Sequence, residues 1–121
     1  MCIRDRILPE NIEYCLIKNK ALKKSTKNVV ENSLRESFIK TAKELEDSGI
    51  DINFSGTTTC MLYLHEHKLF CANLGDSRAV MFSRTADKWH CKPISFDHKA
   101  EDEREASRIK RNGGRIFPYL D

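Results

Sequence analysis

The most informative stretch of this chain is Ala72-Asn73-Leu74-Gly75-Asp76-Ser77-Arg78-Ala79-Val80. An apolar run leads into Gly75, an acid follows at once, and apolar residues resume after Arg78. Glycine suits a sharp corner because it reaches backbone angles that other residues avoid. The pattern therefore predicts a corner that holds Asp76 on a rigid element, as metal and phosphate sites do. Taken alone, the stretch favours the alternative, an Asx-type turn in which Asp76 caps its own backbone.

The residues on either side of this corner have the composition of β-strands. Residues 56–64 and 68–74 are rich in Thr, Leu, Tyr, Phe and Cys, and a short polar break separates them, so they predict an antiparallel hairpin. Residues 78–83 predict a third strand and residues 89–95 a fourth, which Pro93 places near an edge or an end. In the string Ser55-Gly56-Thr57-Thr58-Thr59-Cys60, Gly56 is expected to open the first strand and to allow another backbone to approach closely.

Helical periodicity appears before and after the predicted strands. Residues 8–20 are compatible with a short helix in which Pro9 occupies the first turn. Residues 28–48 predict the strongest helix, and Gly49 is expected to stop it. Its apolar residues share one stripe, expected to lie across one face of the sheet: Val30, Leu34, Phe38, Ala42 and Leu45. Residues 101–112 predict a last helix, with acids early and bases late as the helix dipole favours.

Clustered strands flanked by helices predict an α+β fold with antiparallel sheets rather than alternating βαβ units. The chain has 121 residues, which is one domain at most. With 40% hydrophobic and 32% charged residues it is too apolar for a mostly disordered protein. The net charge of +3 is spread evenly along the chain, so the sequence favours neither nucleic acid nor a membrane as partner.

Targeting signals and cysteine pairing give further expectations. No apolar run approaches the ~20 residues that span a bilayer, and residues 1–20 contain no continuous apolar segment typical of a signal peptide. A cytoplasmic or nuclear location is therefore expected. The 5 cysteines are odd in number and form no C-x-x-C pair, so they are expected to be reduced thiols.

Zinc binding by histidine and cysteine is a weaker alternative. The side chains that would supply the ligands are His65, His67, His90, Cys60, Cys71 and Cys91. His65 and His67 have the spacing of one strand face, but a hairpin turn is expected there and no second pair has ligand spacing.

Four strings in this order resemble the metal-dependent protein serine/threonine phosphatases of type 2C. The family's pattern is SGTT, then NxGDSRA at the end of an apolar strand, then DHKP, then E-x-x-R-I-x-x-x-G-G. The matching residues are Ser55–Thr58, Asn73–Ala79, Asp97–Lys99 and Glu105–Gly114. Ala100 stands where the family usually has proline. Without the other strings, residues 97–114 would indicate only a helix N-terminus, an exposed charged helix and a glycine stop.

The resemblance implies a fold and a chemistry. It implies that the chain is part of a four-layer α-β-β-α sandwich in which two divalent cations, Mg²⁺ or Mn²⁺, lie between antiparallel sheets. A water that bridges the two metals attacks the phosphorus of a phosphoserine or phosphothreonine in a phosphoprotein substrate. The resemblance assigns Asp76 to a third, accessory metal, and it implies a complete protein that is monomeric.

Several family motifs are absent from these 121 residues. The sequence contains neither DGHGG nor GDN, which hold the main metal pair in the family. We therefore expect an internal fragment: residues 8–121 form a partial phosphatase domain, and residues 1–7 are unmatched and artefactual. Asp76 is the only metal ligand that carries over, so the chain alone is expected to be inactive. The alternative function is a non-catalytic, pseudophosphatase-like binding or regulatory module.

Overall fold

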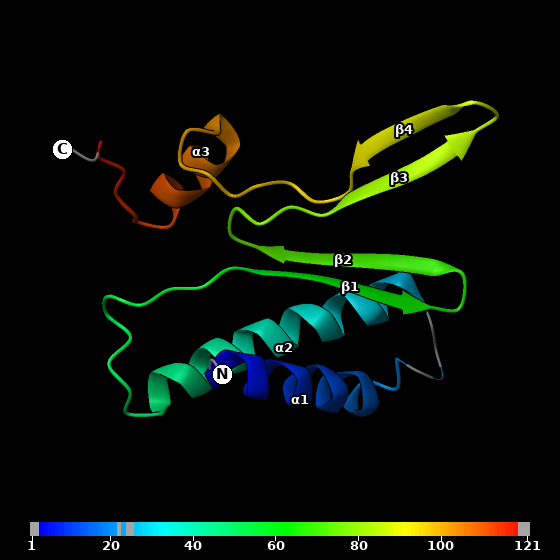
Figure 1. Ribbon diagram of the computed structural model, residues 1–121. Helices are drawn as coiled ribbons and strands as arrows, with labels where there is room; N and C mark the ends of the chain where they lie inside the picture. Colours follow the sequence, from blue (N-terminus) through cyan, green and yellow to red (C-terminus); the bar gives the residue numbers. More distant parts are fainter. Residues whose placement is uncertain (1–2, 22, 24–25, 119–121) are drawn as a thin grey trace. The chain divides into compact units, whose positions relative to one another are not determined.

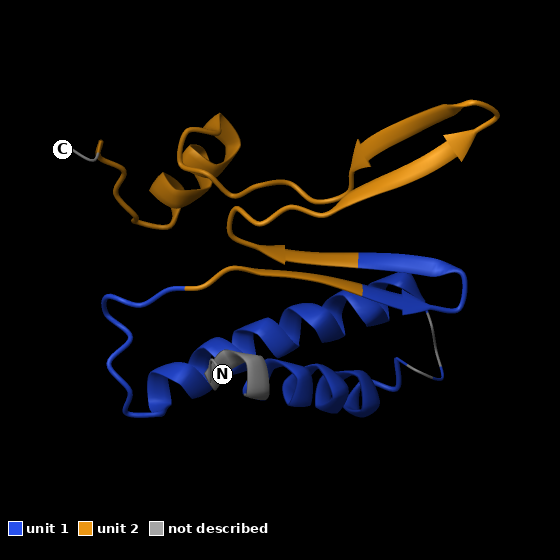
Figure 2. Ribbon diagram, in the orientation of Figure 1, with its two compact units in different colours: residues 1–56, 63–70 blue, residues 57–62, 71–121 orange. Residues whose placement is uncertain are grey.

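Figure 1 shows the computed structural model, which describes residues 3–21, 23 and 26–118. The elements follow one another in the predicted order: α1 (Ile3–Lys18), α2 (Lys27–Asp47), β1 (Thr59–His65), β2 (Lys68–Leu74), β3 (Val80–Thr85), β4 (Lys88–Pro93) and α3 (Glu103–Arg111). The chain divides into two compact units (Figure 2). Unit 1 contains residues 1–56 and 63–70, and unit 2 contains residues 57–62 and 71–121. The predicted α+β class is confirmed.

In the described part of the chain, the four strands form two separate antiparallel hairpins, β1–β2 and β3–β4, instead of one sheet. The β3–β4 register runs from Val80 opposite Pro93 to Thr85 opposite Lys88. Each hairpin has a two-residue turn whose first residue, Glu66 or Ala86, has a positive φ of 54° or 49°. Such short turns suit antiparallel neighbours because their twist matches that of the strands.

Unit 1 is built on the packing of α1 against α2. The buried row of α2 is Val30, Ser33, Leu34, Ser37 and Thr41. The predicted apolar stripe is therefore only partly right: Val30 and Leu34 are buried, whereas Ala42 is exposed. The hydroxyl side chains of this row can be buried because each bonds back to its own helix, as Thr41 does to the Ser37 carbonyl at 2.8 Å.

A polar network joins the two helices. Asn11 of α1 donates to the Thr41 hydroxyl at 3.0 Å and to the Glu44 carboxylate at 2.7 Å, and it accepts a hydrogen bond from Lys40. Lys40 also pairs with Glu44 at 2.6 Å. Because Asn11 is almost fully buried, these bonds satisfy polar groups that would otherwise be costly to bury.

The helix ends confirm some predictions and correct one. Gly49 and Gly113 follow α2 and α3 with φ of +71° and +78°, as expected for helix stops. The prediction that Pro9 lies in a first turn is wrong, because α1 begins at Ile3 and contains Pro9 in its interior. A proline there removes one backbone hydrogen bond, and the helix still continues on both sides.

Candidate functional site

The corner predicted at Gly75 lies in unit 2. Gly75 has φ of +97°, and a Cβ placed on it would lie 2.5 Å from the Thr58 Cγ2 atom. Both the angle and the space therefore require glycine at this position. The expectation of a close backbone approach at Gly56 is wrong, because a Cβ placed on Gly56 would have no other atom within 4 Å. The close approach occurs at Gly75 instead, since this residue meets the segment that leads into β1.

Side-chain hydrogen bonds connect the corner to its neighbours. The hydroxyls of Thr58 and Ser77 lie 2.6 Å apart, which ties the SGTT string to the GDSR string. The Asn73 amide donates to the Gly75 carbonyl at 3.1 Å and to the Phe96 carbonyl at 2.8 Å. These contacts cross from one motif to another, so the first three strings of the sequence pattern form one connected structure.

Asp97 is held by Arg78 in a bidentate pair. The guanidinium donates from Nε and from one terminal nitrogen to the two carboxylate oxygens, each at 2.8 Å. Lys99 approaches the same carboxylate at 3.6 Å. The hydrogen bonds from Arg78 lower the pKa of the Asp97 carboxyl below its usual range. Asp97 therefore positions the corner, and its carboxylate is already occupied.

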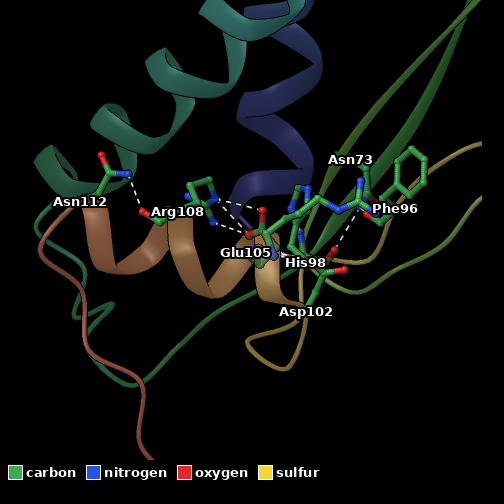
Figure 3. A network of polar contacts seen from close by, with 9 residues as sticks. Asn73, Phe96, His98, Asp102, Glu105, Arg108 and Asn112 are labelled. Carbon is green, nitrogen blue, oxygen red and sulfur yellow. Dashed lines mark hydrogen bonds and ion pairs between the residues drawn. The ribbon is translucent and has the colours of Figure 1, made fainter.

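His98 and the beginning of α3 complete the network. The His98 amide donates to the Gly75 carbonyl at 3.0 Å, and the Gly75 amide donates to the His98 Nδ1 atom at 3.3 Å. Asp102 caps α3 by accepting from the Arg104 amide at 2.8 Å. Figure 3 shows His98 close to Glu105, which Arg108 contacts at 2.6 Å. The hydrogen bonds from Arg108 lower the pKa of the Glu105 carboxyl below its usual range.

Asp76 differs from these acids because its side chain is exposed and contacts no other group that the structure describes. The Asx-type turn is therefore not what the structure shows, since no backbone amide of the described residues donates to the Asp76 carboxylate. A rigid corner thus presents one free carboxylate to solvent.

One carboxylate is too little for a tight Mg²⁺ site, which needs several oxygen ligands in octahedral geometry. Across residues 3–21, 23 and 26–118, no group of three or more His, Cys, Asp or Glu side chains is arranged to hold a metal ion. The described residues therefore do not fit a complete metal pair. The same observation removes support from the zinc alternative, in which His65, His67 and His90 would join cysteines.

The sequence pattern missed the pairing of Arg78 with Asp97 and of Gly75 with His98. Each partner is separated from the other by about twenty positions, so no local pattern connects them. The sequence does contain one signal for the first pair. The GDSR string carries the basic Arg78 and the DHK string that follows it carries the acidic Asp97, so the two strings could form an ion pair. Asp76 was singled out correctly as a corner residue, but its role as a ligand stays a prediction.

The sequence model of the family described as Protein phosphatase 2C matches residues 5–119. The chain belongs to the protein phosphatase 2C family. "Probable protein phosphatase 2C 75" of Oryza sativa subsp. japonica is 41% identical over 96 residues, which cover 78% of this chain and 22% of the relative. "Protein phosphatase 2C homolog 2" of Aspergillus flavus is 35% identical over 106 residues, which cover 87% of this chain and 23% of the relative.

The phosphatase 2C chain thus spans less than a quarter of the length of these two relatives. A third relative, "Probable protein phosphatase 2C 3" of Paramecium tetraurelia, is 33% identical over 111 residues, covering 82% of this chain and 35% of that protein. No solved structure matches the chain. Among the described residues, no helix is both long and apolar enough to cross a bilayer.

Proposed function

We propose that the complete protein containing this chain is a metal-dependent serine/threonine phosphatase. Its substrates are phosphoproteins, from which it removes phosphate from serine and threonine using Mg²⁺ or Mn²⁺. The single observation that carries the proposal is the family match over residues 5–119. The connected geometry of the SGTT, GDSR and DHK strings supports it, because the residues of the family pattern contact one another here.

Within that protein, we assign Asp76 the role of a ligand to an accessory metal. Its carboxylate is exposed and uncommitted, whereas the neighbouring Asp97 is bound by Arg78. The corner that carries Asp76 is fixed on both sides by contacts from Thr58 and His98. A ligand on such a rigid corner loses little conformational freedom when it binds a cation.

The isolated chain is proposed to be inactive. A pair of metals with a bridging hydroxide needs several carboxylates to hold cations about 3.5–4 Å apart. The described residues bring no such group together, so they supply neither an activated nucleophile nor charge neutralisation of the phosphate. This chain therefore contributes the scaffold of the corner and one ligand.

A phosphopeptide assay with Mn²⁺ tests the function. We expect turnover by the longest protein expressed from the same gene and none by the 121-residue chain. Metal-dependent turnover by the chain itself, lost in Asp76→Ala, would show that its site is complete. A longer product that carries the family's metal aspartates but shows no turnover would instead favour the pseudophosphatase-like binding module.

Metal binding by Asp76 is testable without activity. When Mn²⁺ is added to the isolated chain, paramagnetic broadening of amide NMR signals should be strongest at Asp76 and Ser77. Asp76→Asn should remove this local broadening. Asp87→Asn, in the exposed β3–β4 turn, is the matched control and should leave it unchanged. Broadening that persists in Asp76→Asn would contradict the assignment while leaving the phosphatase proposal intact.

A further inference from the structure

Two cysteines lie on neighbouring strands of the β1–β2 hairpin, Cys60 in β1 and Cys71 in β2. The two-residue turn puts His65 opposite Lys68, so counting back along both strands puts Cys60 opposite Asn73. Gly75 fits the same count, since a Cβ placed on it would meet Thr58. Opposed residues and residues two positions apart share one face of a hairpin. Cys60 and Cys71 are therefore diagonal neighbours on the same face.

The two thiols are free and interact with each other. Neither is part of a disulfide, and both are half-buried. Burial, followed by the neighbouring Cys60 thiol, raises the pKa of Cys71. A raised pKa keeps Cys71 protonated at neutral pH and makes it a slow target for peroxide, which attacks thiolates. Oxidation by peroxide is thus disfavoured at Cys71.

The spacing also disfavours a direct disulfide. Diagonal neighbours in a hairpin are about 7–8 Å apart at Cα, whereas disulfides usually need about 4.4–6.8 Å. One additional atom between the sulfurs bridges such a gap. The bridging atom must be one that is satisfied by two protein ligands, because no third His, Cys, Asp or Glu side chain joins the pair in the described part of the chain.

We propose that Cys60 and Cys71 form a two-thiol site that binds one thiophilic centre of the class represented by trivalent arsenicals. An arsenous oxide R–As=O condenses with both thiols: the two S–H bonds and the arsenic–oxygen bonds break, two As–S bonds form and one water leaves. Arsenic stays trivalent, so no oxidant or reductant is required.

Access to the site depends on the exposure of its face. Leu62, which is opposite Cys71, and Leu64 share this face, and both side chains are at least half exposed. A small apolar arsenical such as phenylarsine oxide can therefore reach the thiols and pack its ring on leucine. The first As–S bond makes the second intramolecular, which raises affinity by about 10²–10⁴ over a single thiol.

The experiment titrates the reduced chain with phenylarsine oxide. We expect one tight adduct per chain, with the loss of two titratable thiols per arsenic, that resists glutathione and is reversed by ethanedithiol. Trypsin cleaves after Lys68, between the two cysteines, and after Lys43 and Arg78. Peptides 44–68 and 69–78 should therefore appear as a single mass joined through arsenic. Separate peptides in the adduct would overturn the proposal, whatever the behaviour of any variant.

Variants provide the second measurement. Cys60→Ser and Cys71→Ser should each weaken binding about 100-fold or more, to the level of a single thiol. The matched control is Cys91→Ser, because Cys91 is an exposed cysteine in the other hairpin. This control should keep the tight adduct. Loss of the adduct in Cys91→Ser, or its survival in Cys71→Ser with an unchanged circular dichroism spectrum, would overturn the proposal.

Discussion

The helix pair α1–α2 and the region from β3 to α3 are held together in different ways. The helix pair buries Leu8, Cys15, Leu16, Val30 and Leu34. By contrast, β3, β4 and α3 contain no buried residue. Their neighbourhood is organised by polar contacts, such as the pair between Arg78 and Asp97. Apolar burial stabilises the first region, while glycine geometry and hydrogen bonds shape the second.

The residues of the phosphatase pattern lie outside the helix pair. The GDSR and DHK strings, together with Thr57 and Thr58 of SGTT, lie in unit 2, and none of these residues is buried. Their geometry depends on contacts that are each weak, because surface hydrogen bonds and ion pairs add little net stability. Substitutions in the helix pair should therefore lower the free energy of unfolding. Substitutions at the corner should mainly change the local geometry.

The largest expected effect is loss of packing in the helix pair. Leu34→Ala removes a side chain that is only 4% exposed, and should lower the free energy of unfolding by about 2–5 kcal/mol. Phe82→Ala in β3 is the matched change, and because Phe82 is 62% exposed it should cost about 0.5 kcal/mol or less. Urea unfolding followed by the helical circular dichroism signal measures both. Equal losses of unfolding free energy in the two variants would contradict the conclusion that apolar burial stabilises the helix pair more than the region from β3 to α3.

The next effect is strain at the corner. Gly75→Ala combines an unfavourable φ of +97° with overlap of Thr58, and together these should cost about 2–4 kcal/mol locally. Gly113→Ala is the control, because its φ is also positive but nothing lies within 4 Å, so only the angle is penalised. Hydrogen exchange of the His98 amide, which bonds to the Gly75 carbonyl, reports the change. Unchanged exchange in Gly75→Ala would show that the corner is not rigid.

The sequence predicted the elements well because each has a local signal. Gly49 and Gly113 mark helix ends, and the change from helical to alternating periodicity marks the first strand. The burial of α2 was predicted less well. An apolar stripe predicts which residues can be buried, but Ser33 and Ser37 are buried because small hydroxyl groups let a second helix approach. Such a choice depends on the partner helix, and no periodicity in α2 encodes it.

The site was predicted as a set of strings and not as a set of contacts. Asp76 follows a glycine, so its place on a corner is a local property that the sequence contains. The partner of Arg78 lies 19 positions away and is fixed only when residues 94–98 return alongside the corner. The sequence alone could not show that the Asp97 carboxylate is bound by Arg78 while the Asp76 carboxylate is free.

A smaller effect is expected from the polar network of the helix pair. Asn11 is 4% exposed, and Asn11→Ala removes the donor to the buried Thr41 hydroxyl and one of the two side-chain donors to Glu44. The loss should be about 1–3 kcal/mol in the free energy of unfolding. Asn32→Ala, at an exposed position of α2, should instead be neutral or slightly stabilising because alanine favours helix. If Asn11→Ala is neutral in the same urea experiment, apolar packing alone stabilises this region.

The smallest effect concerns the ion pair at the corner. Arg78 lowers the pKa of Asp97, so the ionised carboxylate favours the folded state. That contribution is present above the pKa of the unfolded chain and is lost as pH falls through the lowered pKa of the folded one. Arg78→Gln should raise the pKa of Asp97 and thereby weaken this acid dependence.

Lys99 should keep part of the shift in Arg78→Gln, because it lies 3.6 Å from the same carboxylate. An NMR titration of the Asp97 carboxyl carbon measures the change, and Arg84→Gln is the control, since Arg84 contacts only the Ala86 carbonyl among the described residues. Because 58% of the Arg78 side chain is exposed, salt should screen the pair, and the shift should shrink at high ionic strength. A shift that is unaffected by both Arg78→Gln and salt would mean that backbone contacts alone hold the DHK segment beside the corner.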